Sequence, residues 1–215
     1  MPNPPTNPKI YHIAHVDRLA SVIESGGLLS DSVMCQRAGA GTTIGMGKIK
    51  QRRLSLAIEC HRDTYVADYV PFYFCTRSVM LYLIYMGNHQ DLTYRGGQGP
   101  IVHMESDLSE VVDWANEQGR KWCFSLSNAG ACYTEFRNDL TQLSEINWPA
   151  VMATDFRQAD IKEGKQAEFL LHGYFPWHLV RRIGVHSTAV AQQVYAATQG
   201  ADHRPPVEIR TEWYY

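Results

Sequence analysis

The sequence lacks any apolar run long enough to cross a membrane, and its first residues have neither the basic start nor the apolar stretch of a secretory signal. We therefore expect no membrane association and a cytoplasmic location. Residues 1–8 contain four prolines and are expected to form a short extended lead-in. Residues 1–215 show no internal repeat and no composition shift, so we predict a single domain.

Cysteine is scarce and odd in number. The five cysteines include no Cys-x-x-Cys pair, which argues against a disulfide framework and favours a reducing compartment. Cys60 and His61 are adjacent rather than spaced as metal ligands, so no metal site is expected. Cys60 also lacks the surrounding motif that a Cys–His protease would need.

The sequence has no excess of positive charge. It contains 20 Lys and Arg against 22 Asp and Glu, a formal net charge of −2. A global positive field that would hold nucleic acid is therefore absent. Any nucleic acid must bind through a local basic patch.

The common nucleotide and hydrolase motifs are missing. The glycine-rich residues 36–47 fail the phosphate-loop pattern because Thr42 and Ile49 stand where it needs Gly and Ser or Thr. The dinucleotide fingerprint fails at Ile44, and no Gly-x-Ser-x-Gly elbow is present. We predict that residues 36–47 form a flexible substrate or lid loop.

The hydrophobic pattern predicts strands and helices in mixed order. Strands are expected over 9–14, 69–75, 101–104, 121–125, 183–186 and 207–215. Helices are expected after a cap at Asp17, from 48, over 79–86, 107–118 and 136–143, after 148, after 176 and over 189–197, with a polar loop over 154–165. Because strands and helices do not alternate regularly, the pattern favours an α+β fold.

Two local features of the aromatic strand and its following helix carry specific expectations. Pro71 cannot donate to a strand ladder, so it marks an edge strand or a bulge. The next helix begins after Ser78 and stops at Gly87. It is apolar nearly all round, which predicts that it is well buried.

The most informative segment is Gln166-Ala167-Glu168-Phe169-Leu170-Leu171. Strand alternation places Gln166 and Glu168 on one face and Phe169 on the other. An amide and a carboxylate displayed together suit a site that binds ribose hydroxyls and stabilises positive charge at an anomeric carbon. An edge strand with a solvated glutamate is the alternative. Taken singly, His12, Tyr73 and Met80 are better explained as ordinary core positions.

Five stretches in order along the chain carry a family resemblance. They are residues 10–15, Gln51-Arg52-Arg53, residues 68–82, residues 165–170 and Trp213-Tyr214-Tyr215. Together they resemble the DarT family, bacterial toxins that transfer ADP-ribose from NAD to DNA bases. The resemblance implies an ADP-ribosyltransferase-like α+β fold with two packed central β-sheets flanked by helices. It also implies NAD as co-substrate, single-stranded DNA as partner and a macrodomain antitoxin. Separately, we expect the protein to be a monomer.

The resemblance also implies site residues. Glu168 matches the catalytic glutamate, and Arg53 matches an arginine near the transferring ribose and the target base. The expected NAD-binding residues are Tyr11, His12, Ala14, Tyr73, Met80 and Gln166. The basic residues expected at the DNA are Lys48, Lys50, Arg52, Arg77, Arg157 and Lys165, with 154–165 as substrate-recognition loop.

The acceptor implied by the resemblance is thymine in single-stranded DNA. A single strand exposes the Watson–Crick edge without an unpairing cost. A related branch modifies guanine, so the base identity stays open, as does the group that takes the base proton. An RNA- or protein-directed enzyme of the same fold and a catalytically inactive NAD-binding module are the alternatives. Gln166 in place of Glu argues against an arginine-directed enzyme.

Overall fold

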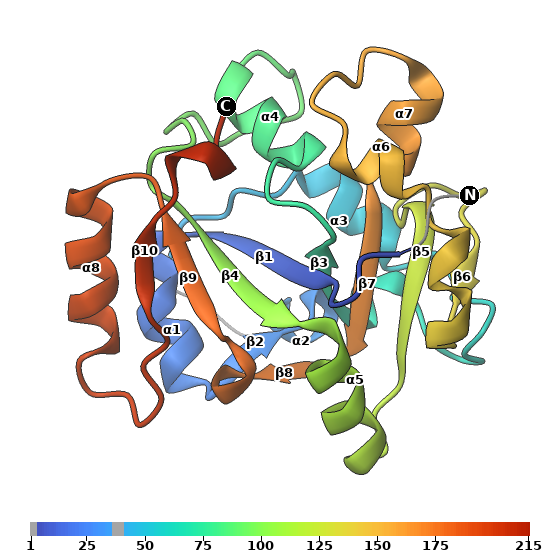
Figure 1. The fold of residues 1–215 in the computed structure, drawn as a ribbon, viewed down its shortest axis with the longest axis horizontal. Helices are drawn as coiled ribbons and strands as arrows, with labels where there is room; N and C mark the ends of the chain where they lie inside the picture. The colour runs from blue at the N-terminus through green and yellow to red at the C-terminus, as the bar shows by residue number, and fades with distance from the viewer. Residues whose placement is uncertain (1–3, 36–40) are drawn as a thin grey trace.

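The structure, a computed structural model, describes residues 4–35 and 41–215. Its centre is an eight-stranded sheet (Figure 1). In spatial order the strands are β10 (Val207–Ile209), β9 (Arg182–Val185), β4 (Ile101–Asp107), β1 (Lys9–His15), β3 (Tyr69–Tyr73), β7 (Ala167–His172), β5 (Trp122–Asn128) and β6 (Phe136–Arg137). A small second sheet pairs β2 (Gly27–Leu29) with β8 (Tyr174–Pro176).

The large sheet consists of two halves that meet between β1 and β3. These two strands are joined in register only at Tyr11 and Tyr73, whereas β1 pairs with β4 at seven positions and β3 with β7 at five. Figure 1 shows β1 crossing β3 and β7 at a wide angle. The pairing therefore gives two sub-sheets with a junction in the middle of the molecule.

Pro71 explains part of this junction. Its carbonyl oxygen faces β1 and accepts a hydrogen bond from the His12 ring at 2.8 Å. In an antiparallel strand the N–H of a residue points to the same side as its carbonyl, so the proline removes a donor on that side. The prediction of an edge strand was wrong, because β3 lies inside the sheet and Pro71 pairs with Leu170 of β7.

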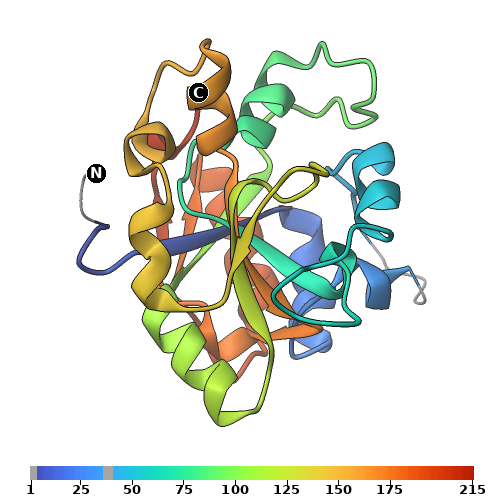
Figure 2. The same ribbon diagram turned by 90° about the vertical axis from the view of Figure 1, so that its right-hand side faces the viewer.

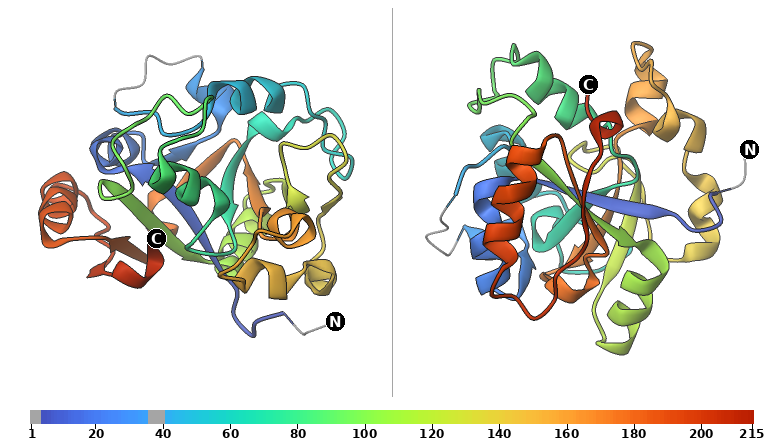
Figure 3. Two further views of the ribbon diagram at one scale, coloured as in Figure 1. Left: turned by 90° about the horizontal axis from the view of Figure 1, so that it is seen from above. Right: turned by 60° about the vertical axis from the view of Figure 1, so that its left-hand side comes forward.

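Helices surround the sheet and crowd one end of it. They are α1 (Leu19–Glu24), α2 (Asp31–Met34), α3 (Gly47–Arg53), α4 (Val79–Met86), α5 (Leu108–Glu117), α6 (Trp148–Met152), α7 (Ala159–Gly164) and α8 (Thr188–Thr198). Figures 1 and 2 show α4, α6 and α7 standing at the end of the sheet where the C-terminus also lies. Helix α8 packs beside α1 on the far side (Figure 3).

The two faces of β3 and β7 lie in different environments. Phe72 and Phe169 enter the main hydrophobic core, together with side chains of α5 and α8. Tyr73 packs instead on a second cluster built around Leu81, Ile84 and the C-terminal residues. Because Tyr73 and Glu168 are register partners, the Glu168 side chain projects on this second face, as the alternation predicted.

Several element predictions need correction. Helix α1 begins one residue after Arg18, and the carboxylate of Asp17 accepts hydrogen bonds from Thr42 instead of capping it. Residues 136–143 contain strand β6 and the start of a 3₁₀ helix, Leu140–Glu145, rather than one continuous helix. The last strand ends at Ile209 and a 3₁₀ turn follows.

Two corrections concern the end of the sheet where the helices crowd. The predicted loop 154–165 contains α7. Helix α4 begins after Ser78, whose side chain caps it, and ends at Gly87, as expected. It is less buried than predicted, since Tyr85 is 51 % exposed.

Residues 36–40 of the predicted lid loop lie outside the described residues. Within residues 4–35 and 41–215, no helix has the length and hydropathy needed to span a membrane.

Candidate active site

The central feature of the site is a buried ion pair between Arg53 and Glu168. The Nη2 of Arg53 donates to both carboxylate oxygens of Glu168, at 2.6 and 2.7 Å. The two side chains are only 10 % and 4 % exposed. Burial lowers the pKa of Arg53, but the Glu168 carboxylate, together with smaller effects of Tyr73 and Asp31, gives a net rise of that pKa, so the guanidinium stays charged.

Both residues are placed by the ends of regular elements. Arg53 is the last residue of α3, the basic helix that the sequence predicted. Glu168 is the second residue of β7. The Nε of Arg53 is buried and has no hydrogen-bond partner among the described residues.

Strand β5 fixes the backbone of Glu168 through an irregularity. Its register with β7 shifts between Phe124 and Asn128. In the gap, the Ser125 hydroxyl accepts the Glu168 backbone N–H at 2.9 Å. The Ser125 hydroxyl donates in turn to the Ser127 carbonyl at 2.7 Å. A side chain thus replaces a missing ladder partner next to the reactive carboxylate.

Gln166 is held beside this point by another side chain of β5. The Nδ2 of Asn128 donates to the Gln166 Oε1 at 3.1 Å, and the Gln166 Nε2 donates to the Lys162 carbonyl at 3.0 Å. Sequence reasoning missed both Ser125 and Asn128. The predicted strand ended at Ser125, and no motif singled out either residue.

Tyr73 stands across the strand pair from Glu168. Burial, with the Glu168 carboxylate beside it, raises the pKa of the Tyr73 phenol, which is therefore neutral at pH 7. Tyr11, Tyr73 and Met80 pack around the second hydrophobic cluster. The structure thus gathers three of the residues predicted to line the NAD pocket. The side chain of Ala14 differs, because it lies in the main core.

His12 lies at the junction of the two half-sheets. Its Nδ1 is 2.8 Å from the Pro71 carbonyl oxygen. Burial lowers the pKa of the imidazole, so the ring is neutral at pH 7. A carbonyl oxygen only accepts, so the proton is on Nδ1 and the lone pair of Nε2 is left to accept a hydrogen bond from a ligand hydroxyl.

Asp31 of α2 accepts a hydrogen bond from Lys50 at 2.6 Å. Burial is the largest cause acting on the pKa of both His12 and Arg53, and the Asp31 carboxylate has a smaller effect that raises both pKa values. That the His12 ring and the Glu168 carboxylate flank one NAD ribose stays a prediction.

The basic residues predicted at the DNA fall into different environments. Arg52 is exposed on α3. Lys48 and Arg157 are exposed and paired with Asp91 and Asp155, at 2.5 Å each. The guanidinium carbon of Arg77 is 5.0 Å from the ring centre of Tyr215, and its Nε donates to the Tyr214 carbonyl at 2.8 Å.

Lys165 is a correction to the predicted DNA contacts. It is 3 % exposed, its Nζ donates to the Val151 carbonyl at 2.9 Å, and it lies 5.8 Å from the Phe156 ring centre. The Lys165 ammonium group therefore links the start of the Gln166–Glu168 segment to the end of α6. A phosphate would not reach it without moving these groups.

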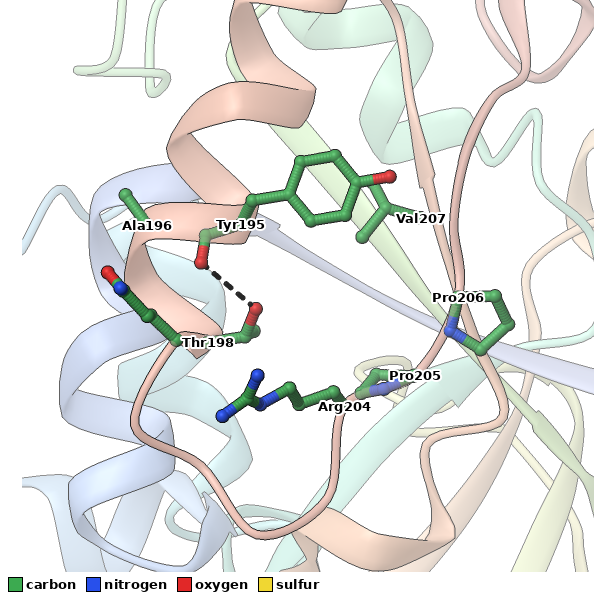
Figure 4. Close-up of a pocket in the computed structure, with 8 residues that line it drawn as sticks. Tyr195, Ala196, Thr198, Arg204, Pro205, Pro206 and Val207 are labelled. Atoms are coloured by element: carbon green, nitrogen blue, oxygen red, sulfur yellow. Dashed lines mark hydrogen bonds between the residues drawn. The ribbon is translucent and has the colours of Figure 1, made fainter.

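Two cavities in the described part of the chain lie elsewhere. One of about 550 Å³ opens between the end of α8 and the segment before β10 (Figure 4). The other, of about 670 Å³, is lined by residues of α5 and of the segment after it. Residues 4–35 and 41–215 contain no group of three or more His, Cys, Asp or Glu side chains placed to hold a metal ion.

A split sheet with a buried arginine–glutamate pair beside its junction defines the class, an ADP-ribosyltransferase fold. A family model described as "ssDNA thymidine ADP-ribosyltransferase, DarT" matches residues 11–215, and the chain belongs to this family. A DNA ADP-ribosyl transferase of Thermus aquaticus is 37% identical over 208 residues, which cover 96% of this chain and 88% of the relative.

Solved structures agree with this assignment. Thermus sp. 2.9 DarT in complex with ADP-ribosylated ssDNA matches with a TM-score of 0.88 and 33% identity, covering 98% of each chain. The same protein in complex with NAD+ matches with a TM-score of 0.85 and 32% identity, covering 99% of this chain and 100% of that one. The predicted α+β fold, DarT family, NAD co-substrate and DNA ADP-ribosyltransferase class are confirmed.

Proposed function

We propose that this chain transfers ADP-ribose from NAD to a thymine base of single-stranded DNA. The bond between nicotinamide and the ribose anomeric carbon breaks, and a bond from that carbon to a thymine ring nitrogen forms. Nicotinamide leaves with the bonding electron pair, and the proton of the thymine nitrogen is released. The proposal agrees with the NAD+ and ADP-ribosylated ssDNA complexes of the Thermus sp. relative.

One observation carries the proposal at the level of residues. Glu168 is a buried carboxylate held by the charged Arg53, at the edge of the junction that also contains neutral His12. Its two oxygens together offer about four lone-pair directions, so it can accept a ribose hydroxyl while Arg53 stays bound. A fixed carboxylate at this place stabilises the positive charge that develops on the ribose when nicotinamide leaves.

We assign roles to the remaining residues from their unpaired hydrogen-bonding atoms or from their apolar packing. The His12 Nε2 accepts a ribose hydroxyl of NAD, and Tyr73 and Met80 form the apolar wall on the nicotinamide side. The unpaired Nε of Arg53 donates to a carbonyl oxygen of the acceptor base, where it stabilises the anion formed on loss of the proton. Arginine is a poor base, so Glu168 is the group we assign to receive that proton.

The proposed biological role rests on family membership. We propose that the chain is the toxin of a toxin–antitoxin pair and that a macrodomain protein removes its modification. We further propose that it acts in the cytoplasm as a monomer. All five cysteines are free thiols, which fits a reducing compartment.

Mass spectrometry of four short single-stranded oligonucleotides that differ at one base tests the proposal. Each is incubated with NAD and the protein. The thymine oligonucleotide should gain the mass of one ADP-ribose, and Glu168→Gln should abolish the gain. A gain only with guanine would change the acceptor. If NAD binds and none of the four oligonucleotides gains mass, the proposal of a DNA acceptor is refuted.

A further inference from the structure

The connection between β5 and β6 contacts three separate parts of the site. Asn128 at its start donates to Gln166. A side chain placed at Gly130 would come within 3.3 Å of the Arg52 Nη2, so the connection lies directly against α3. Tyr133 near its end donates its hydroxyl proton to Glu163 of α7 at 2.9 Å. Figure 2 shows this connection, in yellow, reaching toward α3.

Tyr133 presents an aromatic ring to solvent at this place. It is 66 % exposed, although its hydroxyl is tied to α7. The hydrogen bond at its hydroxyl restricts the ring, yet most of the side chain stays exposed to solvent. Such a ring can stack against a flat apolar group of a binding partner.

Two further groups belong to the same region. One is a carboxylate oxygen, and the other is a positively charged guanidinium. The second carboxylate oxygen of Glu163 is buried and has no partner among the described residues. The hydrogen bond to Glu163 raises the pKa of the Tyr133 phenol. Arg52 lies against the same β5–β6 connection at Gly130 and is one residue before the Arg53 of the catalytic pair.

We propose that Tyr133 and Arg52 form a subsite for the nucleotide next to the acceptor base in single-stranded DNA. The base stacks on the Tyr133 ring, and the Arg52 guanidinium meets the phosphate. The inference rests on the proposed function, since it adds a neighbouring site to the same strand.

General physics of single-strand binding supports this assignment. Proteins hold single strands by alternating cationic contacts to phosphates with aromatic platforms for bases. The net charge of −2 makes such a local arrangement necessary here. Stacking tolerates any base, so the subsite sets the position of the strand.

Three variants in the full chain test the inference. They are Tyr133→Ala, Tyr133→Phe, and Tyr195→Ala as a matched control. Tyr195 is comparably exposed, at 57 %, and lies on α8 on the far side of the sheet (Figures 1 and 4). We measure kcat and KM for a thymine oligonucleotide, together with the Kd for NAD.

Tyr133→Ala should raise the KM for the oligonucleotide roughly ten-fold or more while the Kd for NAD stays within two-fold. Tyr133→Phe and Tyr195→Ala should stay within about three-fold of the original chain. An unchanged KM in Tyr133→Ala overturns the inference. An equal rise in Tyr133→Phe also overturns it, because the hydroxyl tether rather than the ring would then be responsible.

A fluorescent base gives a second readout. An oligonucleotide with 2-aminopurine next to the thymine should lose fluorescence on binding, and Tyr133→Ala should restore it. Equal quenching by both proteins overturns the inference. If the original chain modifies no oligonucleotide at all, the proposed function fails. If it modifies DNA and Tyr133→Ala does so equally well, only the subsite fails.

Discussion

Arg53 reaches both carboxylate oxygens of Glu168 through a single nitrogen, Nη2, and its Nε is left buried without a partner among the described residues. Burying an ion pair costs more desolvation free energy than forming one at the surface. A buried pair is therefore weak evidence for a stabilising role. Its geometry is better explained by function. The carboxylate is oriented before substrate binds, and an arginine donor stays available for the acceptor.

The first prediction concerns the stability of this pair. Arg53→Met leaves an uncompensated buried carboxylate and should lower the unfolding free energy at pH 7 by about 3–5 kcal/mol. The double variant Arg53→Met, Glu168→Leu removes both charges and should recover most of that loss. Urea unfolding of the single and double variants measures the coupling. All of these variants should lack transferase activity, and simply additive stability losses would contradict a coupled pair.

The second prediction concerns Ser125. Ser125→Ala leaves the buried Glu168 N–H without an acceptor, which should cost about 1–3 kcal/mol of stability. It should also loosen the carboxylate, so that kcat falls more than KM for NAD rises. Steady-state kinetics separates the two parameters. Ser127→Ala is the control, because the Ser127 hydroxyl contacts Thr134 and not the catalytic strand. Equal kcat losses in both variants would refute the assigned role.

The third prediction separates a surface arginine from a buried lysine. Arg52→Gln should reduce the slope of log Kd against log salt for single-stranded DNA by about 1, as expected for a lost phosphate contact. Lys165→Met should leave that slope unchanged, because Lys165 binds the Val151 carbonyl and not DNA. Salt titrations followed by fluorescence anisotropy measure both. A slope change in Lys165→Met would restore the original prediction that Lys165 contacts DNA.

The fourth prediction follows from a buried histidine of β4. Burial lowers the pKa of His103 to about 4, and its Nε2 contacts the Thr76 carbonyl. Below the unfolded-state pKa of about 6.5 the unfolded chain binds a proton that the folded chain refuses, so stability falls as the pH drops from there toward 4.

The total loss across that window should be about 3 kcal/mol. His103→Gln should remove this part of the pH dependence. Urea unfolding at pH 7, 5.5 and 4.5 measures it. A His103→Gln curve parallel to that of the original chain would show that His103 keeps an ordinary pKa.

The sequence predicted the elements whose signals are local. The cap at Ser78 and the stop at Gly87 bound α4, and the alternation around Glu168 correctly separated its face from that of Phe169. These features depend on neighbouring residues only. The ion-pair partners Arg53 and Glu168 are 115 residues apart, and only the family resemblance brought them together in advance.

The errors at Pro71 and Lys165 arise where tertiary contacts override local preference. Pro71 looked like an edge residue, but the missing donor falls at the junction where β1 supplies a histidine side chain instead of a ladder. Lys165 looked like a surface charge, yet a carbonyl and an aromatic ring satisfy it inside the protein. Strands β2, β6 and β8 have two or three residues each, too few for a periodic pattern.

The most direct test of the central claim is a crystal structure of the Glu168→Gln variant with NAD bound. The account predicts that the nicotinamide-side ribose lies between the His12 Nε2 and the amide at position 168, within hydrogen-bond distance of both. It also predicts Tyr73 and Met80 beside the nicotinamide. A dinucleotide bound elsewhere, or a ribose that contacts only one of the two side chains, would contradict it.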